Sequence, residues 1–111
     1  MDKKLKQIQQ GDVLLQEVES MPGDAIKSQA GGRIVLAVGE KTGHSHSIIS
    51  EKANLWTIKD VDETLNYLEV LEPVTLVHDE HKALPIPKGI YKIGLVKEYD
   101  YFSEMERRVI D

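Results

Sequence analysis

Short apolar runs separated by turn-forming residues dominate the chain. The clearest is residues 33–39, where aliphatic side chains are flanked by glycines, as expected for a buried strand. Residues 13–18 follow a Gly-Asp turn signal, and residues 65–71 and 74–77 are two further runs of the same kind. Side chains of residues 90–99 alternate between two faces, which is typical of a β-strand. The pattern therefore predicts several short strands joined by tight turns.

The rest of the chain adds strands and no helix. Residues 44–49 and 53–58 are predicted to be extended, residues 25–29 are ambiguous, and residues 104–111 form either a last strand or a tail. No segment has an amphipathic helical pattern of useful length. We therefore predict an all-β domain of about seven short strands, either a small barrel or a sandwich.

The predicted domain boundaries leave short ends on both sides of one β-domain. Residues 1–10 form an N-terminal tail, residues 11–102 form the β-domain, and residues 103–111 form the C-terminal strand or tail. A chain of 111 residues suits one domain with a core of its own.

Composition narrows the classes of function. There is no cysteine, which excludes disulfides, thiolate metal sites and cysteine nucleophiles and fits a reducing compartment. No apolar run is long enough for a membrane span, and residues 1–10 lack the apolar region of a secretory signal, so we expect a soluble cytoplasmic protein. The net charge of −5 disfavours nucleic-acid binding. A small-molecule ligand and a homodimer formed through strand edges are the partners that we expect.

All four histidines lie in two short segments. His44 and His46 are two residues apart, so on a strand both rings point to the same face, with Cα atoms about 6.5–7 Å apart. His78 and His81 are three residues apart, a spacing at which a turn brings both rings to one side. Each pair lies beyond an apolar run, so two core strands could bring the pairs together. We expect the histidines to converge on one polar site.

Such a site suits a divalent metal ion. Imidazole with one carboxylate binds zinc, nickel, iron or manganese, and Asp79 and Glu80, which lie between His78 and His81, are candidate carboxylates. A free coordination position on the metal would activate water. Two alternatives stay open, namely acid–base chemistry by histidines without metal, and a non-enzymatic interaction module whose histidines form polar loops or a binding groove.

Two resemblances arise from these residues. Residues 39–51, GEKTGHSHSIISE, resemble the first motif of the cupin family, which implies His44, His46 and Glu51 as metal ligands in a cupin-like fold. Residues 86–90 resemble the Pro-x-Gly turn of the second cupin motif, although Lys92 stands where that motif has its last histidine. His78 or His81 would then have to replace it.

The second resemblance covers most of the chain. The combination of Gly-Glu-x-Thr-Gly-His-Ser-His, Leu-Val-His-x-Glu-His and Lys-Glu-Tyr is similar to small uncharacterised proteins of bacteria and their phages. This resemblance implies no activity, so the sequence leaves open whether the protein is an enzyme.

Overall fold

The protein is built from antiparallel β-strands. The computed structural model describes residues 5–38, 45–59 and 62–95, and these ranges contain ten strands and no helix. The strands are β1 (Gln7–Gln10), β2 (Val13–Val18), β3 (Ile26–Ala30), β4 (Arg33–Val38), β5 (Ser45–Ile49), β6 (Ala53–Lys59), β7 (Thr64–Val70), β8 (Val74–Val77), β9 (Leu84–Ile86) and β10 (Gly89–Leu95). No helix in the described ranges is long and apolar enough to cross a membrane.

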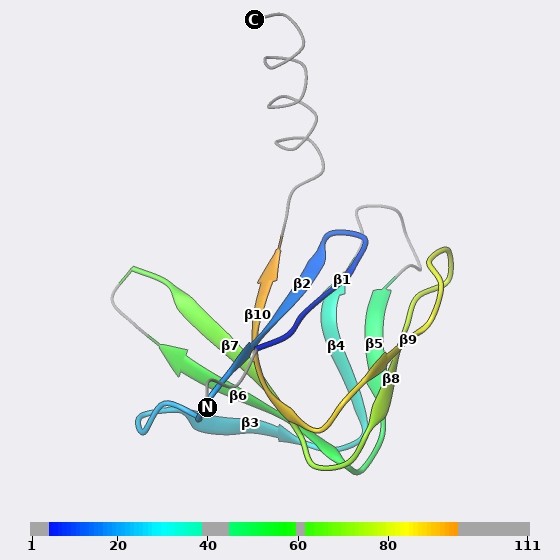
Figure 1. The fold of residues 1–111 in the computed structure, drawn as a ribbon. Coiled ribbons are helices and arrows are strands. Elements are labelled where there is room, and N and C mark those ends of the chain that lie inside the picture. The colour runs from blue at the N-terminus through cyan, green and yellow to red at the C-terminus, as the bar shows by residue number, and fades with distance from the viewer. Residues whose placement is uncertain (1–4, 39–44, 60–61, 96–111) are drawn as a thin grey trace, which may run out of the picture.

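The strands form two sheets that face each other (Figure 1). One has six strands in the order β1-β2-β10-β7-β6-β3, and the other has four in the order β4-β5-β8-β9. The arrangement is sandwich-like, and the strands of the described ranges form no continuous ladder that closes a barrel. The predicted all-β class is therefore confirmed, and of the two architectures considered the structure has the sandwich.

All passages between the two sheets lie at one end of the sandwich. The chain crosses from β3 to β4, from β5 to β6, from β7 to β8 and from β9 to β10 through short turns at residues 31–32, 50–52, 71–73 and 87–88. We call this the corner end. Gly32 and Ser50 exchange two backbone hydrogen bonds of 3.0 Å there, so pairing continues around the bend. Gly31 and Gly32 have φ values of 63° and 85°, which glycine adopts without strain.

The core lies between the inner faces of the two sheets. Alternation along each strand places apolar side chains inward, as in β2, where Val13 and Leu15 are fully buried and Gln16 is exposed. The buried core residues are Val13, Leu15, Ile34, Ile48, Ala53, Leu68, Val70, Val74, Leu76, Ile86 and Tyr91. Burial of these side chains is the main force that holds the sheets together.

Three strands were not predicted from the apolar pattern. Gln7–Gln10 form β1, although the sequence analysis assigned them to an N-terminal tail, and β3 and β9 add to the seven strands expected. These strands are short, and β1 and β3 lie at the edges of the six-stranded sheet. A strand that is polar and exposed has no apolar alternation to reveal it. The predicted strand or tail at residues 103–111 lies outside the described residues.

Candidate metal site

Strand register brings His46 and His78 together. In the β5–β8 pair, Ser47 is opposite Val77 and Ile48 is opposite Leu76. Continuing this antiparallel register by one residue sets His46 opposite His78, and the centroids of their rings are 4.3 Å apart. His46 is only 2 % exposed because its side chain shares the inner face of β5 with Ile48.

The turn between β8 and β9 brings the third ring into the cluster. Nδ1 of His78 accepts hydrogen bonds from the backbone N–H groups of Glu80, at 3.0 Å, and of His81, at 3.3 Å. The ring of His81 consequently lies 4.6 Å from that of His78 and 5.7 Å from that of His46, centroid to centroid. One ligand atom from each of the three histidines lies within 4.8 Å of the others. We call these three residues the histidine cluster.

A buried glutamine on β1 orients the His46 ring. The side-chain amide of Gln10 donates hydrogen bonds to the carbonyl oxygens of Leu76, at 3.1 Å, and Lys82, at 2.9 Å. Oε1 of Gln10 lies 2.8 Å from Nδ1 of His46. Gln10 therefore connects the six-stranded sheet to β5 and to the β8–β9 turn. The β1–β2 and β8–β9 turns lie at the end of the sandwich opposite the corner end, which we call the open end (Figure 1).

The β1–β2 turn covers the cluster. Gly11 and Asp12 form a two-residue hairpin between Gln10 and Val13, with a φ of 56° at Gly11. A Cβ atom added at Gly11 would lie 2.6 Å from Nε2 of His81 and 3.1 Å from Cε1 of His46, so the turn fits closely against both rings. Oδ1 of Asp12 lies 3.0 Å from Nε2 of His46, and the Asp12 side chain is 44 % exposed.

The surroundings favour the neutral form of His46. Burial lowers the pKa of His46 below 6.5, and the nearby His78 lowers it further, while the Asp12 carboxylate acts in the opposite direction. A neutral imidazole keeps a lone pair on one ring nitrogen. Near neutral pH, His46 can therefore act as a metal ligand.

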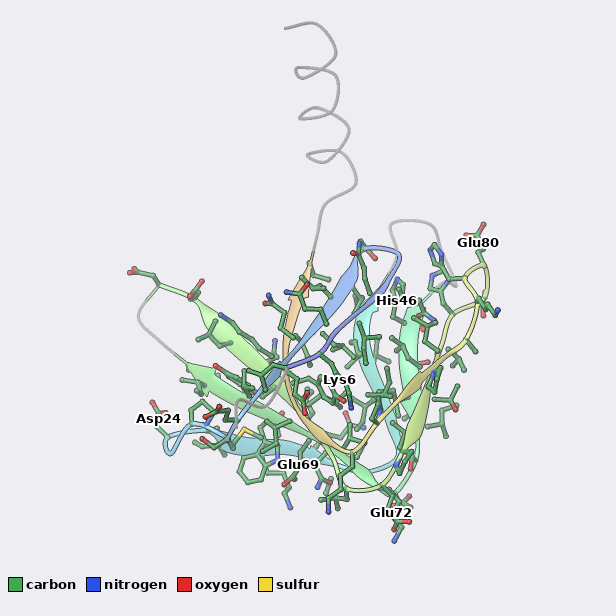
Figure 2. All side chains as sticks on the ribbon, in the orientation of Figure 1. Lys6, Asp24, His46, Glu69, Glu72 and Glu80 are labelled. Atoms are coloured by element: carbon green, nitrogen blue, oxygen red, sulfur yellow. The ribbon has the colours of Figure 1, made fainter. Side chains whose placement is uncertain are left out.

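The structure brings together three of the predicted site residues. His44 lies outside the described residues. Glu51 lies in the β5–β6 turn at the corner end, where its carboxylate packs against Gly31, so it is not brought to the histidine cluster. Glu80 is exposed on the β8–β9 turn and contributes its backbone N–H to His78 (Figure 2). Lys92 lies on the face of β10 opposite the buried Tyr91.

Two residues of the site were missed by the sequence analysis. Gln10 was assigned to the N-terminal tail, and Asp12 was recognised only as part of a turn. A Gly-Asp pair signals a turn but not what the turn packs against. Nothing in the local sequence indicates that this turn would lie beside a histidine on β5, because their approach depends on how the two sheets face each other.

Fold and site together define a small antiparallel β-sandwich with a cluster of three histidines at the end opposite the corner end, where His46 is buried and His81 is exposed. The chain belongs to the family described as "Domain of unknown function (DUF8820)", whose model matches residues 9–95. The match includes Gln10, Asp12 and the three clustered histidines. No curated protein and no solved structure matches the chain.

Proposed function

We propose that the domain binds one divalent metal ion through His46, His78 and His81. The observation that carries this proposal is the meeting of three imidazoles from two segments, with their ligand atoms within 4.8 Å. A cluster of imidazoles is typical of sites for zinc and other late transition metals.

The geometry is compatible with such an ion once the rings move closer together and His78 gives up its hydrogen bonds from the turn. Ligand atoms that share a tetrahedral zinc ion at about 2.0–2.1 Å are roughly 3.3 Å from one another. The three rings must therefore approach slightly, and the exposed His81 has the most freedom to rotate. His46 is held by Gln10 and provides the fixed point of the site.

Direct metal titration tests the proposal. Protein prepared without a histidine tag and treated with a chelator should bind zinc with a stoichiometry of one, measured by calorimetry. His46→Ala and His81→Ala should each weaken zinc binding at least tenfold. Both variants should keep the circular dichroism spectrum of a folded β-protein. If zinc, nickel, iron and manganese all fail to bind stoichiometrically, the proposal is wrong.

Glu51→Gln is the matched control. It alters a carboxylate that the cupin resemblance assigns to the metal, but at the corner end of β5. With the ligand set proposed here, this variant binds zinc as the unchanged protein does. A large loss of affinity in Glu51→Gln would instead support the cupin-like set of His44, His46 and Glu51.

One observation favours a second candidate, in which the histidines form a polar loop without metal. Nδ1 of His78 already accepts two backbone hydrogen bonds, so a neutral His78 carries its proton on Nε2. A metal ion on Nε2 would move this proton to Nδ1, which could then no longer accept hydrogen bonds. Ligation through Nε2 would therefore require the turn to release both bonds. In the second candidate His78 only stabilises the β8–β9 turn, and His78→Ala lowers the melting temperature equally in chelator and in zinc.

Several other predictions accompany the proposal. A small-molecule ligand at the metal, a homodimer and a cytoplasmic location remain predictions from the sequence. An open coordination position would allow the ion to activate water, as the metal ions of hydrolytic enzymes do. A coordination shell filled by protein groups would make the ion structural.

A further inference from the structure

The hydrogen bonds of Gln10 decide which nitrogen of His46 is available to a metal. The carbonyl oxygens of Leu76 and Lys82 can only accept, so the NH₂ group of Gln10 must face them. Its Oε1 therefore faces Nδ1 of His46 at 2.8 Å, and because this oxygen accepts only, Nδ1 carries the proton. Neutral His46 thus has its lone pair on Nε2.

That lone pair faces a carboxylate. Oδ1 of Asp12 lies 3.0 Å from Nε2 of His46. Two groups that both accept hydrogen bonds are stable at this distance only with a cation between them. The cation is either a proton on Nε2, which makes an ion pair, or a metal ion bound by both atoms. Two ligand atoms on one tetrahedral zinc ion are about 3.3 Å apart, so a small outward movement of Asp12 from the observed 3.0 Å would allow shared coordination.

The position of the turn supports the second arrangement. The backbone at Gly11 packs against the rings of His46 and His81, so that Asp12 is held at the edge of the histidine cluster. The Asp12 side chain is 44 % exposed, so it has room to adjust to a fourth coordination position. Carboxylate oxygen is a common zinc ligand beside histidine.

We propose that Asp12 is the fourth ligand of the ion, so that metal binding joins the β1–β2 turn to β5 and the β8–β9 turn. This inference rests on the proposed function. A shell of three histidines and one aspartate leaves no open position on a tetrahedral ion, which assigns the metal a structural role at the open end of the sandwich.

Cobalt(II) used in place of zinc tests this assignment. The intensity and wavelength of its d–d absorption report the number and type of ligands, and competition with zinc gives both affinities. Asp12→Asn is nearly isosteric, and its amide N–H can donate to the lone pair on Nε2 of His46, so its melting temperature in chelator should match that of the unchanged protein. Asp24→Asn is the matched control, because Asp24 is also an exposed turn residue but lies far from His46 (Figure 2).

The inference predicts that Asp12→Asn weakens zinc binding at least tenfold and changes the cobalt spectrum, while Asp24→Asn changes neither. If Asp12→Asn binds with unchanged affinity and spectrum, Asp12 is only an ion-pair partner of His46, and the inference is wrong while the proposed function stands. Weaker binding with an unchanged spectrum also overturns it, because Asp12 then acts outside the coordination shell. Absence of binding by the unchanged protein overturns both proposals.

Discussion

The two ends of the sandwich hold the sheets together in different ways. At the corner end the chain itself passes between the sheets, and backbone hydrogen bonds such as those between Gly32 and Ser50 continue around the bend. At the open end the contacts involve side chains. Gln10 makes three hydrogen bonds, Asp12 contacts His46, and the backbone of Gly11 packs against two imidazole rings.

This difference indicates which end of such a fold can hold a functional site. The corner end is fixed by covalent connections and apolar burial, so its geometry does not depend on a ligand. The open end gathers polar groups from β1, β5 and the β8–β9 turn, and their separation can respond to an ion. Metal should therefore change the stability of the open end and leave the interactions of the corner end as they are.

The largest effect is expected for a core residue next to the corner. Ile86 ends β9 and is fully buried, so Ile86→Ala should lower the free energy of unfolding by about 2–5 kcal/mol. Urea titration measures the loss, which should be the same in chelator and in zinc. Ile26→Ala, at a position that is 72 % exposed, should stay within about 0.5 kcal/mol of the unchanged protein. A zinc-dependent loss in Ile86→Ala would mean that the two ends are coupled.

The next largest effect is expected at the open end. Gln10→Leu removes a buried amide and leaves Nδ1 of His46 without its acceptor, so we expect a loss of about 1–3 kcal/mol in chelator. It should also weaken zinc binding, because the proton of His46 then moves to Nε2, which faces the Asp12 carboxylate. Two-dimensional ¹⁵N NMR of the imidazoles should report this change of tautomer. Gln7→Leu, on the exposed face of the same strand, is the control, and equal losses in both variants would refute the role of Gln10.

A pH effect is expected at the corner end. Burial, with a contribution from Glu17, raises the pKa of Tyr91 to about 12, and its hydroxyl donates to the carbonyl oxygen of Pro87. Above pH 10 the unfolded chain loses this proton and the folded protein keeps it, so stability falls as pH rises. Between pH 10 and pH 11 the fall is about 1 kcal/mol. Tyr91→Phe should remove it, and identical pH profiles for the two proteins would disprove the assignment.

The smallest effect is expected for the surface ion pair of the corner end. Nζ of Lys52 lies 3.1 Å from Oε2 of Glu72, with both side chains more than half exposed. Solvent and salt screen such a pair, so Lys52→Ala should change the free energy of unfolding by less than about 1 kcal/mol, and less still in 1 M salt. A larger change in thermal or urea unfolding would show that this end depends on surface charge as well as on burial.

The sequence predicted most of the fold because burial leaves a visible pattern. The runs that became β2, β4, β7 and β8 alternate or cluster apolar residues, and the structure places them around one core. β1 and β3 were not predicted because they are exposed edge strands with polar side chains. β1 is held in place by its hairpin with β2 and β3 by its long-range pairing with β6, so neither strand depends on an apolar pattern of its own.

The site was predictable only in part, for a related reason. Clustering of histidine in two segments indicated that they would meet, and the meeting of His46 with His78 follows from the register of β5 and β8. Gln10 and Asp12 reach the cluster from the other sheet, and no local pattern encodes a contact between sheets. Glu51 fitted a motif by spacing alone, but the direction of β5 carries it to the corner end.

Anomalous diffraction at the zinc absorption edge tests the central claim most directly. Crystals of tag-free protein grown with equimolar zinc should show one strong peak among the three rings. It should lie about 2.0–2.1 Å from Nε2 of His46 and from one nitrogen each of His78 and His81. Ordered rings of these three histidines with no anomalous peak between them, in crystals that contain zinc, would contradict the claim.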